Sequence, residues 1–321
     1  MRADGVFAAR TPREYGGAWT GAEGLARGLA ALGRACPSTA WIAGTCATSK
    51  NLAVNTFRES SVREALFADP DALFCGTGVP SARGERVPGG VRVSGRWANV
   101  SGCEDATWAG LALMVEGTFS FAVIPVADLT VDRSWHMAGM RATGSHTLVA
   151  EDLLVPAERV VASGPFRPEE VLMYAITVLG PVVGAAKGAL DAVHAMFASD
   201  RKPFMSAHSR MGESAGARQW LAEATHLVGR AERTMLAVAR VADTGGLSAA
   251  DRPRLQMDLA DAGRDCRAAT ERMMDLHGAS GFTNSNVLQR YWRDIAVAGR
   301  HPHLNPYLAV ESYGTTLVER L

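Results

Sequence analysis

The feature that most constrains this chain is an apolar seam near its C-terminus. Between Leu255 and Leu276 the apolar positions recur at spacings of four, three, four, three, four and three residues. That period places them along one face of an α-helix, which is the pattern of a helix packed in a bundle. The segment Leu221–Val238 repeats the pattern, so the sequence predicts at least two long helices that pack through such seams.

Two further helices are expected around this pair. The segment Val171–Ala198 is strongly apolar, and Pro181 is expected to kink or break its helix because proline removes a backbone hydrogen bond. Another helix is predicted over Asn286–Arg300, where Pro302 should end it. Four up-and-down helices of this length predict a four-helix bundle in the C-terminal half of the chain.

The first half of the chain has a different character. Residues 71 to about 160 alternate apolar residues with polar ones between turns rich in Gly, Pro, Ser and Asp, which predicts a small antiparallel barrel or sandwich. Residues 1 to 70 are rich in Ala and Leu, which predicts helices joined by loops. The expected helices are Gly21–Ala35, Thr39–Gly44 and Ser60–Leu66, and the expected strands are Leu73–Gly76, Val91–Val100, Trp108–Val115, Phe119–Val126 and His146–Val155.

The predicted fold class is therefore α+β in three parts. We expect an N-terminal helical domain over residues 1–70, a central β-barrel over 71–160 and a four-helix bundle over 161–321. Strands do not alternate with helices, and no GxGxxG motif opens a helix after a strand. Both observations argue against a doubly wound nucleotide-binding sheet.

Composition excludes several classes of function. The 321 residues carry a net charge of zero, so there is no basic field to attract nucleic acid or an acidic membrane. Neither a signal peptide nor an apolar run long enough to span a bilayer is recognised, so the expected location is the cytoplasm. Five scattered cysteines without a CxxC pair predict free thiols, mostly buried, and no zinc ribbon.

The central stretch from Gly89 to Trp108 holds the most suggestive polar pattern. Trp97, Asn99 and Ser101 fall at spacing two, so a regular strand would place an aromatic ring, an amide and a hydroxyl on one face. Such a face suits a flat heterocycle with polar edges. On the pattern alone, the simpler interpretation of a strand with a polar outer face is favoured.

Motifs along nearly the whole chain resemble a known family. Together they resemble the oxygenase components of two-component flavin-dependent monooxygenases, which are built on the acyl-CoA dehydrogenase fold. The motifs that carry this resemblance are Pro12–Gly17, Ala35–Trp41, Ser94–Cys103, Gly139–Ser145, Glu151–Pro156, and Gln289–Asp294 followed by Arg300-His301.

The resemblance implies an oxidoreductase that inserts one oxygen atom of O2 into a small molecule through a flavin C4a-hydroperoxide. It implies reduced FMN or FAD, supplied as diffusing flavin by a separate flavin reductase with which the protein has only transient contact. The implied substrate is an aromatic or polyketide-type compound, or an amino sugar, as in secondary metabolism and antibiotic biosynthesis. Oxygenation at carbon or nitrogen, and FMN or FAD, stay open, and the implied assembly is a homotetramer or homodimer.

Two departures from the family bear on this prediction. Acyl-CoA dehydrogenases carry a catalytic glutamate in a Tyr-Glu-Gly-Thr-like stretch, whereas Tyr313-Gly-Thr315 has no glutamate after the tyrosine, which favours an oxygenase. The resemblance also begins inside the family's N-terminal helical domain, so we expect either a misassigned start codon or a shortened member. The alternatives are an acyl-CoA dehydrogenase-type enzyme and a degenerate, non-catalytic member that binds a small molecule or a partner subunit.

The resemblance also implies roles for particular residues. Ser101 is the predicted hydrogen-bond donor to the flavin edge, and His301 is the predicted acid/base because an imidazole titrates near neutral pH. Trp41 and His303 are expected near the substrate, although Trp41 fits the core equally well. No metal site is predicted, because His301, His303 and His277 have no carboxylate or thiol at ligand spacing. The implied cofactor-binding residues are Thr77, Asn99, Ser101, Gly102, Thr143, Ser145, Arg201 (equally a solvated surface arginine), Gly278 and Gly281.

Overall fold

The computed structural model describes residues 4–319, which form two compact units. Each unit draws on segments that are far apart in the sequence, and each is described by itself. The sheet unit consists of the chain up to Gly21, Trp41–Met137 and Arg141–Phe166, and the helical unit consists of Ala22–Ala40, Ala138–Met140 and the chain from Arg167 onward.

The sheet unit is built on one eight-stranded sheet in the order β6-β7-β3-β2-β4-β5-β8, with β1 paired to β4. Most pairings are antiparallel, as predicted, but β1 and β2 both pair with β4 in parallel. The sequence patterns did not predict the three strands β2, β6 and β8. The strands are β1 (Phe74–Thr77), β2 (Ala82–Val87), β3 (Gly90–Val100), β4 (Trp108–Val115), β5 (Thr118–Pro125), β6 (Thr130–Asp132), β7 (His146–Pro156) and β8 (Val160–Ala162).

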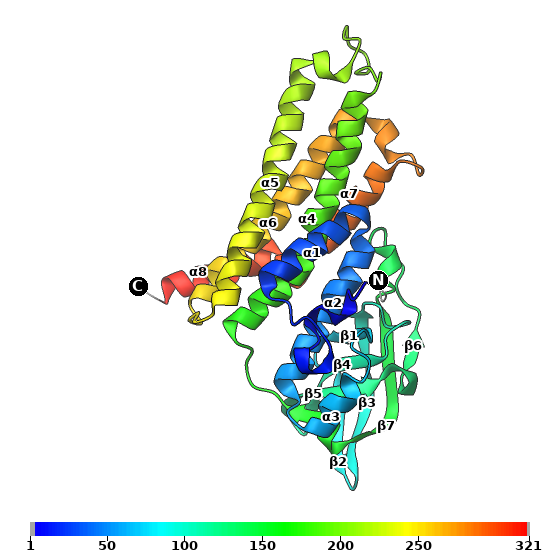
Figure 1. The fold of residues 1–321 in the computed structure, drawn as a ribbon, viewed down its shortest axis with the longest axis vertical. Helices are drawn as coiled ribbons and strands as arrows, with labels where there is room; N and C mark the ends of the chain where they lie inside the picture. Colours follow the sequence, from blue (N-terminus) through cyan, green and yellow to red (C-terminus); the bar gives the residue numbers. More distant parts are fainter. Residues whose placement is uncertain (1–3, 320–321) are drawn as a thin grey trace. The chain divides into compact units, whose positions relative to one another are not determined.

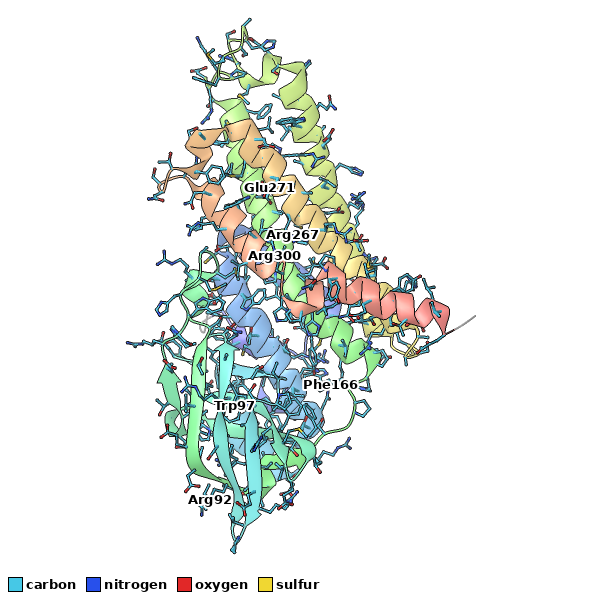
Figure 2. The ribbon with its side chains drawn as sticks, turned by 180° about the vertical axis from the view of Figure 1, so that it is seen from behind. Arg92, Trp97, Phe166, Arg267, Glu271 and Arg300 are labelled. Carbon is cyan, nitrogen blue, oxygen red and sulfur yellow. The ribbon has the colours of Figure 1, made fainter. Side chains whose placement is uncertain are left out.

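Strand β3 does not present the polar face that its sequence pattern indicated. Its pairing with β7 shifts register between Trp97 and Val100, and Asn99 adopts a left-handed φ of 60° at this irregularity. Trp97 is fully buried among the strands (Figure 2), where its Nε1 donates to the backbone oxygen of Ala112 at 2.7 Å, whereas Asn99 is exposed. The prediction that Trp97, Asn99 and Ser101 share one face is therefore wrong, because the bulge breaks the two-residue alternation.

Helices in the N-terminal part of the chain begin close to where the sequence predicted. Helix α3 spans Ser60–Leu66, and helix α2 starts at Pro37, where the missing N–H costs no helical bond, and continues to Thr56. In the sheet unit, the fully buried Lys50 of α2 donates to the oxygens of Phe7, Thr11 and Pro70 at 2.7–2.9 Å. These bonds compensate the cost of burying an ammonium group and tie the N-terminal segment to α2.

The helical unit contains the predicted bundle and two more helices, α1 and α8. The long helices α4, α5 and α6 lie side by side (Figure 1). Pro181 lies inside α4 without ending it, so of the predicted kink or break the break is excluded. Within residues 4–319, α4 alone is long and apolar enough to cross a membrane, which the sequence prediction overlooked, but most of it is buried. The bounds are α4 (Pro168–Ala198), α5 (Ala215–Thr244), α6 (Asp251–His277), α7 (Val287–Ala298) and α8 (Pro306–Val318), of which α8 was not predicted.

Helix α1 (Ala22–Ala35) packs against α4 in this unit, rather than in a separate N-terminal domain. Glycine makes the close approach possible, since a Cβ atom on Gly184 would lie 2.3 Å from the oxygen of Ala30. A Cβ atom on Gly33 would likewise lie 2.8 Å from the oxygen of Pro181. The residues after Arg167 therefore share their core with a helix from the start of the chain.

Candidate functional site

A chain of hydrogen-bonded side chains lies in the sheet unit, where β3 ends and β7 begins. The Ser101 and Ser145 hydroxyl oxygens are 2.8 Å apart, and the Ser145 and Thr143 oxygens are 2.7 Å apart. Nε1 of Trp41, on α2, donates to the Ser101 oxygen at 3.0 Å. The structure thus brings together four of the predicted site residues, from three segments of the chain.

The backbone holds this cluster together. The Gly102 N–H donates to the oxygen of Thr143 at 2.8 Å, which joins the turn after β3 to the segment before β7. Gly102 has a φ of 73°, and a Cβ atom there would lie 3.2 Å from the side chain of Ile42. Glycine therefore suits this position for both its conformation and its close contact with α2.

A charged group that the sequence analysis missed borders the cluster. His146 Nε2 lies 3.4 Å from Glu104, whose other oxygen accepts from Arg133 at 2.7 Å. His146 Nδ1 accepts from the backbone N–H of Trp135 at 3.2 Å, which leaves Nε2 to face Glu104. The Arg133 guanidinium and His146 lower the pKa of Glu104. Only the adjacency of His146 to Ser145 could have drawn attention to it in the sequence.

Thr77 and Asn99 are the predicted flavin contacts of the sheet unit that lie outside the hydroxyl chain. The Thr77 hydroxyl, at the end of β1, accepts from the backbone N–H of Val79 at 3.2 Å. Asn99 is exposed at the irregularity of β3. Neither residue is hydrogen-bonded to the Ser101 hydroxyl in the sheet unit.

Three other predicted residues come together in the helical unit. Arg201 donates to the backbone oxygen of His277 at 2.5 Å and to the Ser280 hydroxyl at 2.8 Å. Gly278, with a φ of 72°, and Gly281 lie in the same segment, where α6 ends. Burial and the Arg201 charge lower the pKa of His277. Arg201 is thus held by this turn rather than extended into solvent.

His301 and His303 form a second group in the helical unit. Their ring centroids are 5.4 Å apart, and Nδ1 of His301 accepts from the backbone N–H of His303 at 3.3 Å. Burial, with the neighbouring His303, lowers the pKa of His301 to about 3, and burial lowers the pKa of His303 to about 4. This lowered pKa differs from the near-neutral titration expected from sequence, because loss of water around the partly buried His301 imidazole disfavours its charged form.

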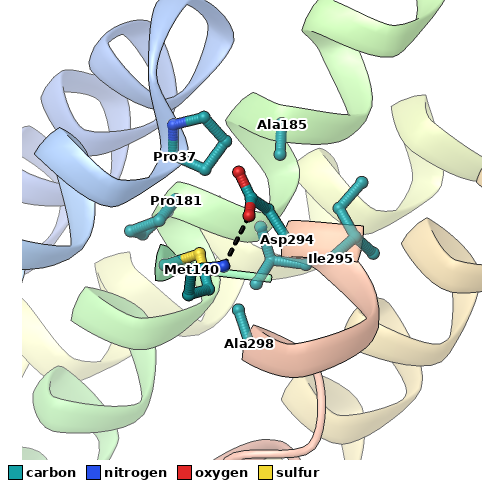
Figure 3. A pocket seen from close by; sticks show the side chains of 8 residues that line it. Pro37, Met140, Pro181, Ala185, Asp294, Ile295 and Ala298 are labelled. Atoms are coloured by element: carbon teal, nitrogen blue, oxygen red, sulfur yellow. Dashed lines mark hydrogen bonds between the residues drawn. The ribbon is translucent and has the colours of Figure 1, made fainter. Parts of the chain in front are cut away.

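An apolar crevice lies beside the C-terminal half of α7 in the helical unit (Figure 3) and is too narrow to hold a water molecule. Asp294 accepts from the backbone N–H of Met140 at 2.5 Å, and burial raises the pKa of this carboxyl group. Arg293 donates to the backbone oxygen of Ala138, so α7 holds the 138–140 segment at two points. The crevice is lined by Pro37, Met140, Pro181, Val182, Ala185, Asp294, Ile295 and Ala298.

Residues 4–319 contain all five cysteines of the chain. All five cysteines are free and four are buried, which confirms the prediction for the thiols. No group of three or more His, Cys, Asp and Glu side chains in these residues is arranged to hold a metal ion.

Comparison with known proteins places the chain in a family. The family described as "Acyl-CoA dehydrogenase, C-terminal domain" matches residues 176–306. The chain is 30% identical to the FADH(2)-dependent resorcinol hydroxylase, oxygenase component, of Rhizobium sp., over 95% of this chain and 83% of that protein. It is 31% identical to a pigment production hydroxylase of Rhodococcus sp., over 97% of this chain and 86% of that protein.

A solved structure agrees with these sequence matches. XiaF from Streptomyces sp., in complex with FADH2 and glycerol, matches with a TM-score of 0.91 and 28% identity, over 98% of this chain and 86% of that chain. The protein therefore belongs to the oxygenase components of flavin-dependent monooxygenases, on the acyl-CoA dehydrogenase fold. It is an oxidoreductase that uses reduced flavin and O2, with a separate flavin reductase as partner. The predicted family, fold class, enzyme class and cofactors are confirmed.

The residues of the sheet unit fit a flavin edge. The flavin ring presents carbonyl and N–H groups along one side, and hydroxyl groups can both donate to and accept from such groups. Ser101, Ser145 and Thr143 supply three buried hydroxyls, with Ser145 lying 2.8 Å from Ser101 and 2.7 Å from Thr143. In the helical unit, Arg201 supplies a guanidinium, the donor best suited to phosphate.

Proposed function

We propose that this oxygenase hydroxylates a small aromatic molecule at carbon. Two relatives that match nearly the whole chain are named for hydroxylation, one of them for resorcinol, a small phenol. This support favours an aromatic substrate over an amino sugar, and carbon over nitrogen as the site of oxygenation. The single observation that carries the proposal for the site is the hydroxyl chain that ends at Ser101.

Reduced flavin, when bound, activates O2 and supplies the oxygen atom that is transferred. The role we assign to Ser101 is to hydrogen-bond the edge of the ring and hold it in one orientation. A buried donor that is already oriented needs no reorganisation during the reaction and interacts more strongly than a donor in water. Thr77, Asn99 and Gly102 are proposed to lie along the same flavin.

His301 and His303 are proposed to contact the substrate as neutral imidazoles. With a pKa lowered to about 3, His301 is uncharged at neutral pH. Its Nδ1 accepts from the His303 N–H, so in the neutral ring Nε2 carries the proton. A hydrogen-bond donor that stays neutral can polarise a phenolic oxygen without first losing a proton, which differs from the general base expected from sequence.

The assembly and setting follow from the same proposal. We place the protein in the cytoplasm as a homotetramer or homodimer, receiving diffusing FMNH2 or FADH2 from a reductase that binds only transiently. Arg201, Gly278 and Gly281 would contact the flavin of a partner subunit, and the hydrogen bonds of Arg201 support this because they fix the guanidinium in place. A role in secondary metabolism, including antibiotic biosynthesis, remains part of the proposal.

The test is an assay with a flavin reductase, NADH, FMN or FAD, and a panel of phenols and aminated sugars. We expect oxygen-dependent hydroxylation of a phenol and an increase in hydrogen peroxide when Ser101→Ala replaces the wild type. Ser120→Ala is the matched control, since Ser120 is another buried serine of the sheet unit, and its hydroxyl donates to the nearby backbone oxygen of Thr118. Turnover of an amino sugar but no phenol would overturn the proposed substrate class. If Ser101→Ala formed the same amount of product per hydrogen peroxide released as the wild type, the proposed role of Ser101 at the flavin would be overturned.

A further inference from the structure

The imidazole of His277, at the end of α6, faces two donors with one of its nitrogens. Its Nε2 lies 3.4 Å from Nη1 of Arg201, which can only donate, and 3.1 Å from Nδ2 of Asn286. The Oδ1 atom of Asn286 accepts from the backbone N–H of Leu288 at 2.9 Å, so the amide atom turned toward His277 is the nitrogen, which is also a donor. Nε2 is therefore the unprotonated nitrogen of a neutral ring.

The other ring nitrogen completes a hydrogen-bond network around Ser280. In a neutral ring with an unprotonated Nε2, Nδ1 carries the proton and donates to the Ser280 hydroxyl oxygen at 3.4 Å. The same oxygen accepts from Nη2 of Arg201 at 2.8 Å, and its own proton goes to the backbone oxygen of His277 at 3.3 Å. Both acceptor positions and the single proton of the Ser280 hydroxyl are then used. One protonation state of His277 thus satisfies all of these contacts.

A second proton on His277 would disrupt this network. The new N–H at Nε2 would point at the donors of Arg201 and Asn286, and a charged ring would face the Arg201 guanidinium. Burial and the Arg201 charge lower the pKa of His277, and Arg201 is the only charged side chain in residues 4–319 that shifts it. The other side-chain partners of the ring, Ser280 and Asn286, are neutral. The surroundings of His277 therefore favour the neutral ring.

We propose that His277 is a positioning residue which, as a neutral imidazole with its proton on Nδ1, fixes the Arg201 guanidinium for the phosphate of a flavin nucleotide. This rests on the proposed function, in which Arg201 contacts the flavin of a partner subunit. Within residues 4–319, three of the five N–H groups of Arg201 are engaged, by the His277 ring, the His277 backbone oxygen and Ser280. Two N–H groups are left for a ligand. A guanidinium that is already fixed loses little side-chain freedom when it binds.

The backbone around His277 keeps the ring in place. A Cβ atom on Gly281 would lie 3.3 Å from Cβ and 3.4 Å from Cγ of His277, so glycine leaves room for the imidazole. Asn286 is the N-cap of α7, so the amide that donates to His277 also fixes the start of that helix. The network therefore joins the segment after α4, the end of α6 and the start of α7.

The first experiment needs no flavin and locates the proton on the His277 ring. The chain has eight histidines, and His277→Gln identifies the His277 signals in an NMR spectrum that correlates ring ¹⁵N with ring ¹H nuclei. At neutral pH we expect a protonated Nδ1 and an unprotonated Nε2, with a pKa below the ordinary value of 6.5. A proton on Nε2 at neutral pH would overturn the proposal.

Asn286→Asp tests the contact from the side of α7. Aspartate keeps the acceptor that caps α7 but replaces the donor facing Nε2 with a carboxylate, so the proton should move toward Nε2 and the pKa of His277 should rise. The matched control is Asn305→Asp, because Asn305 is the N-cap of α8 and accepts from the backbone N–H of Tyr307 at 3.0 Å. The control should leave the His277 signals unchanged. No change in Asn286→Asp, or equal changes in both variants, would contradict the proposed network.

The second experiment measures affinity by anaerobic titration with FMNH2, FADH2 and reduced riboflavin, which has no phosphate. His277→Leu removes the acceptor and should weaken binding of the tighter nucleotide about tenfold, with a much smaller effect on reduced riboflavin. His277→Gln keeps an oxygen acceptor and should restore most of the affinity. Equal losses for the nucleotide and for riboflavin in His277→Leu would exclude a role at the phosphate.

The pH dependence of binding separates the positioning role from a purely structural one. As the pH falls through the lowered pKa of His277, the wild type should lose affinity for the nucleotide, whereas His277→Gln gains no proton and should lose less. Parallel losses in the two proteins would overturn the proposal. If His277→Leu does not fold, this comparison still decides.

Arg201→Ala distinguishes failure of this proposal from failure of the proposed function. If Arg201→Ala weakens nucleotide binding but His277→Leu does not, the positioning role is overturned while the contact of Arg201 with the flavin stands. If Arg201→Ala has no effect, the proposed contact of Arg201 is wrong, and the positioning role fails with it.

Discussion

The sheet unit and the helical unit treat buried polar side chains in different ways. In the sheet unit, Trp41, Ser101, Ser145 and Thr143 satisfy one another at 2.7–3.0 Å and carry no charge. In the helical unit, burial lowers the pKa values of His301 and His303 to about 3 and about 4. Burial therefore leaves the chemistry of a hydroxyl unchanged but converts a titratable imidazole into a neutral donor.

The largest expected effect is loss of stability in acid. The folded-state pKa values of His301 and His303 lie below the ordinary value of 6.5, so their contribution is complete above that pH and is lost as the pH falls. At pH 5 each histidine is protonated in the unfolded chain but not in the folded protein. This difference lowers the free energy of unfolding by about 2 kcal/mol for each histidine. Urea titrations between pH 7 and pH 5 should show this loss of unfolding free energy.

The double variant His301→Gln, His303→Gln is the control for acid stability. Glutamine cannot gain a proton, so the double variant should lose about 4 kcal/mol less than the wild type between pH 7 and pH 5. If the unfolding free energy of the two proteins changed equally with pH, the folded-state pKa values of the two histidines would not be lowered. The contrast with the uncharged hydroxyl chain would then disappear.

Trp97→Phe separates the two tryptophans of the sheet unit. It leaves the buried oxygen of Ala112 without its indole donor and opens space in the core, which should cost about 2–3 kcal/mol of unfolding free energy. Because Trp97 is buried among the strands, the folded variant should form as much product per hydrogen peroxide released (its coupling) as the wild type. A drop in coupling without a drop in unfolding free energy would indicate that Trp97 faces the flavin, as the sequence pattern suggested.

Asp294 tests the helical unit at a site other than the histidines. Asp294→Ala removes the acceptor of the Met140 N–H and should cost about 1–2 kcal/mol, measured by thermal or urea unfolding. Asp294→Asn keeps an oxygen acceptor and should cost less, since burial already disfavours the charged carboxylate and raises its pKa. Equal losses in both variants would mean that the charge, rather than the hydrogen bond, holds the 138–140 segment.

The smallest effect is expected at Glu104. Its ion pair with Arg133 is largely exposed, and exposed pairs contribute less than about 1 kcal/mol. Glu104→Gln should therefore change stability little, while Arg133→Gln serves as the matched change on the other partner. A loss well above that in Glu104→Gln alone would show that the contact with His146 is the stronger of the two.

Much of the fold was predictable because local patterns and packing agree. The apolar seam of α6 and the apolar run of β4 mark elements whose bounds match those expected within a few residues. The strands β2, β6 and β8 were missed, since β6 and β8 have three residues each and β2 carries charged side chains. Helix α8, with its exposed apolar residues, has no periodic seam to reveal it.

The candidate site was predictable as a set of residues but not as an arrangement. Ser101, Thr143 and Ser145 were identified from motifs, and the structure brings their hydroxyls together. Trp97 was misplaced because a register shift in β3 cannot be read from alternation. The pair of Glu104 and His146 was missed because its partners are 42 positions apart and belong to no motif.

The sequence by itself determined where the long bundle helices and the longer strands form, the family, and the residue types available to hold a flavin. It could do so because periodicity and motifs are local properties of the chain. Only the tertiary structure decided which hydroxyls touch, where β3 shifts register, and that His301 and His303 are neutral. Hydrogen bonds and pKa values depend on distance and burial. Distance and burial are set only when remote segments pack together.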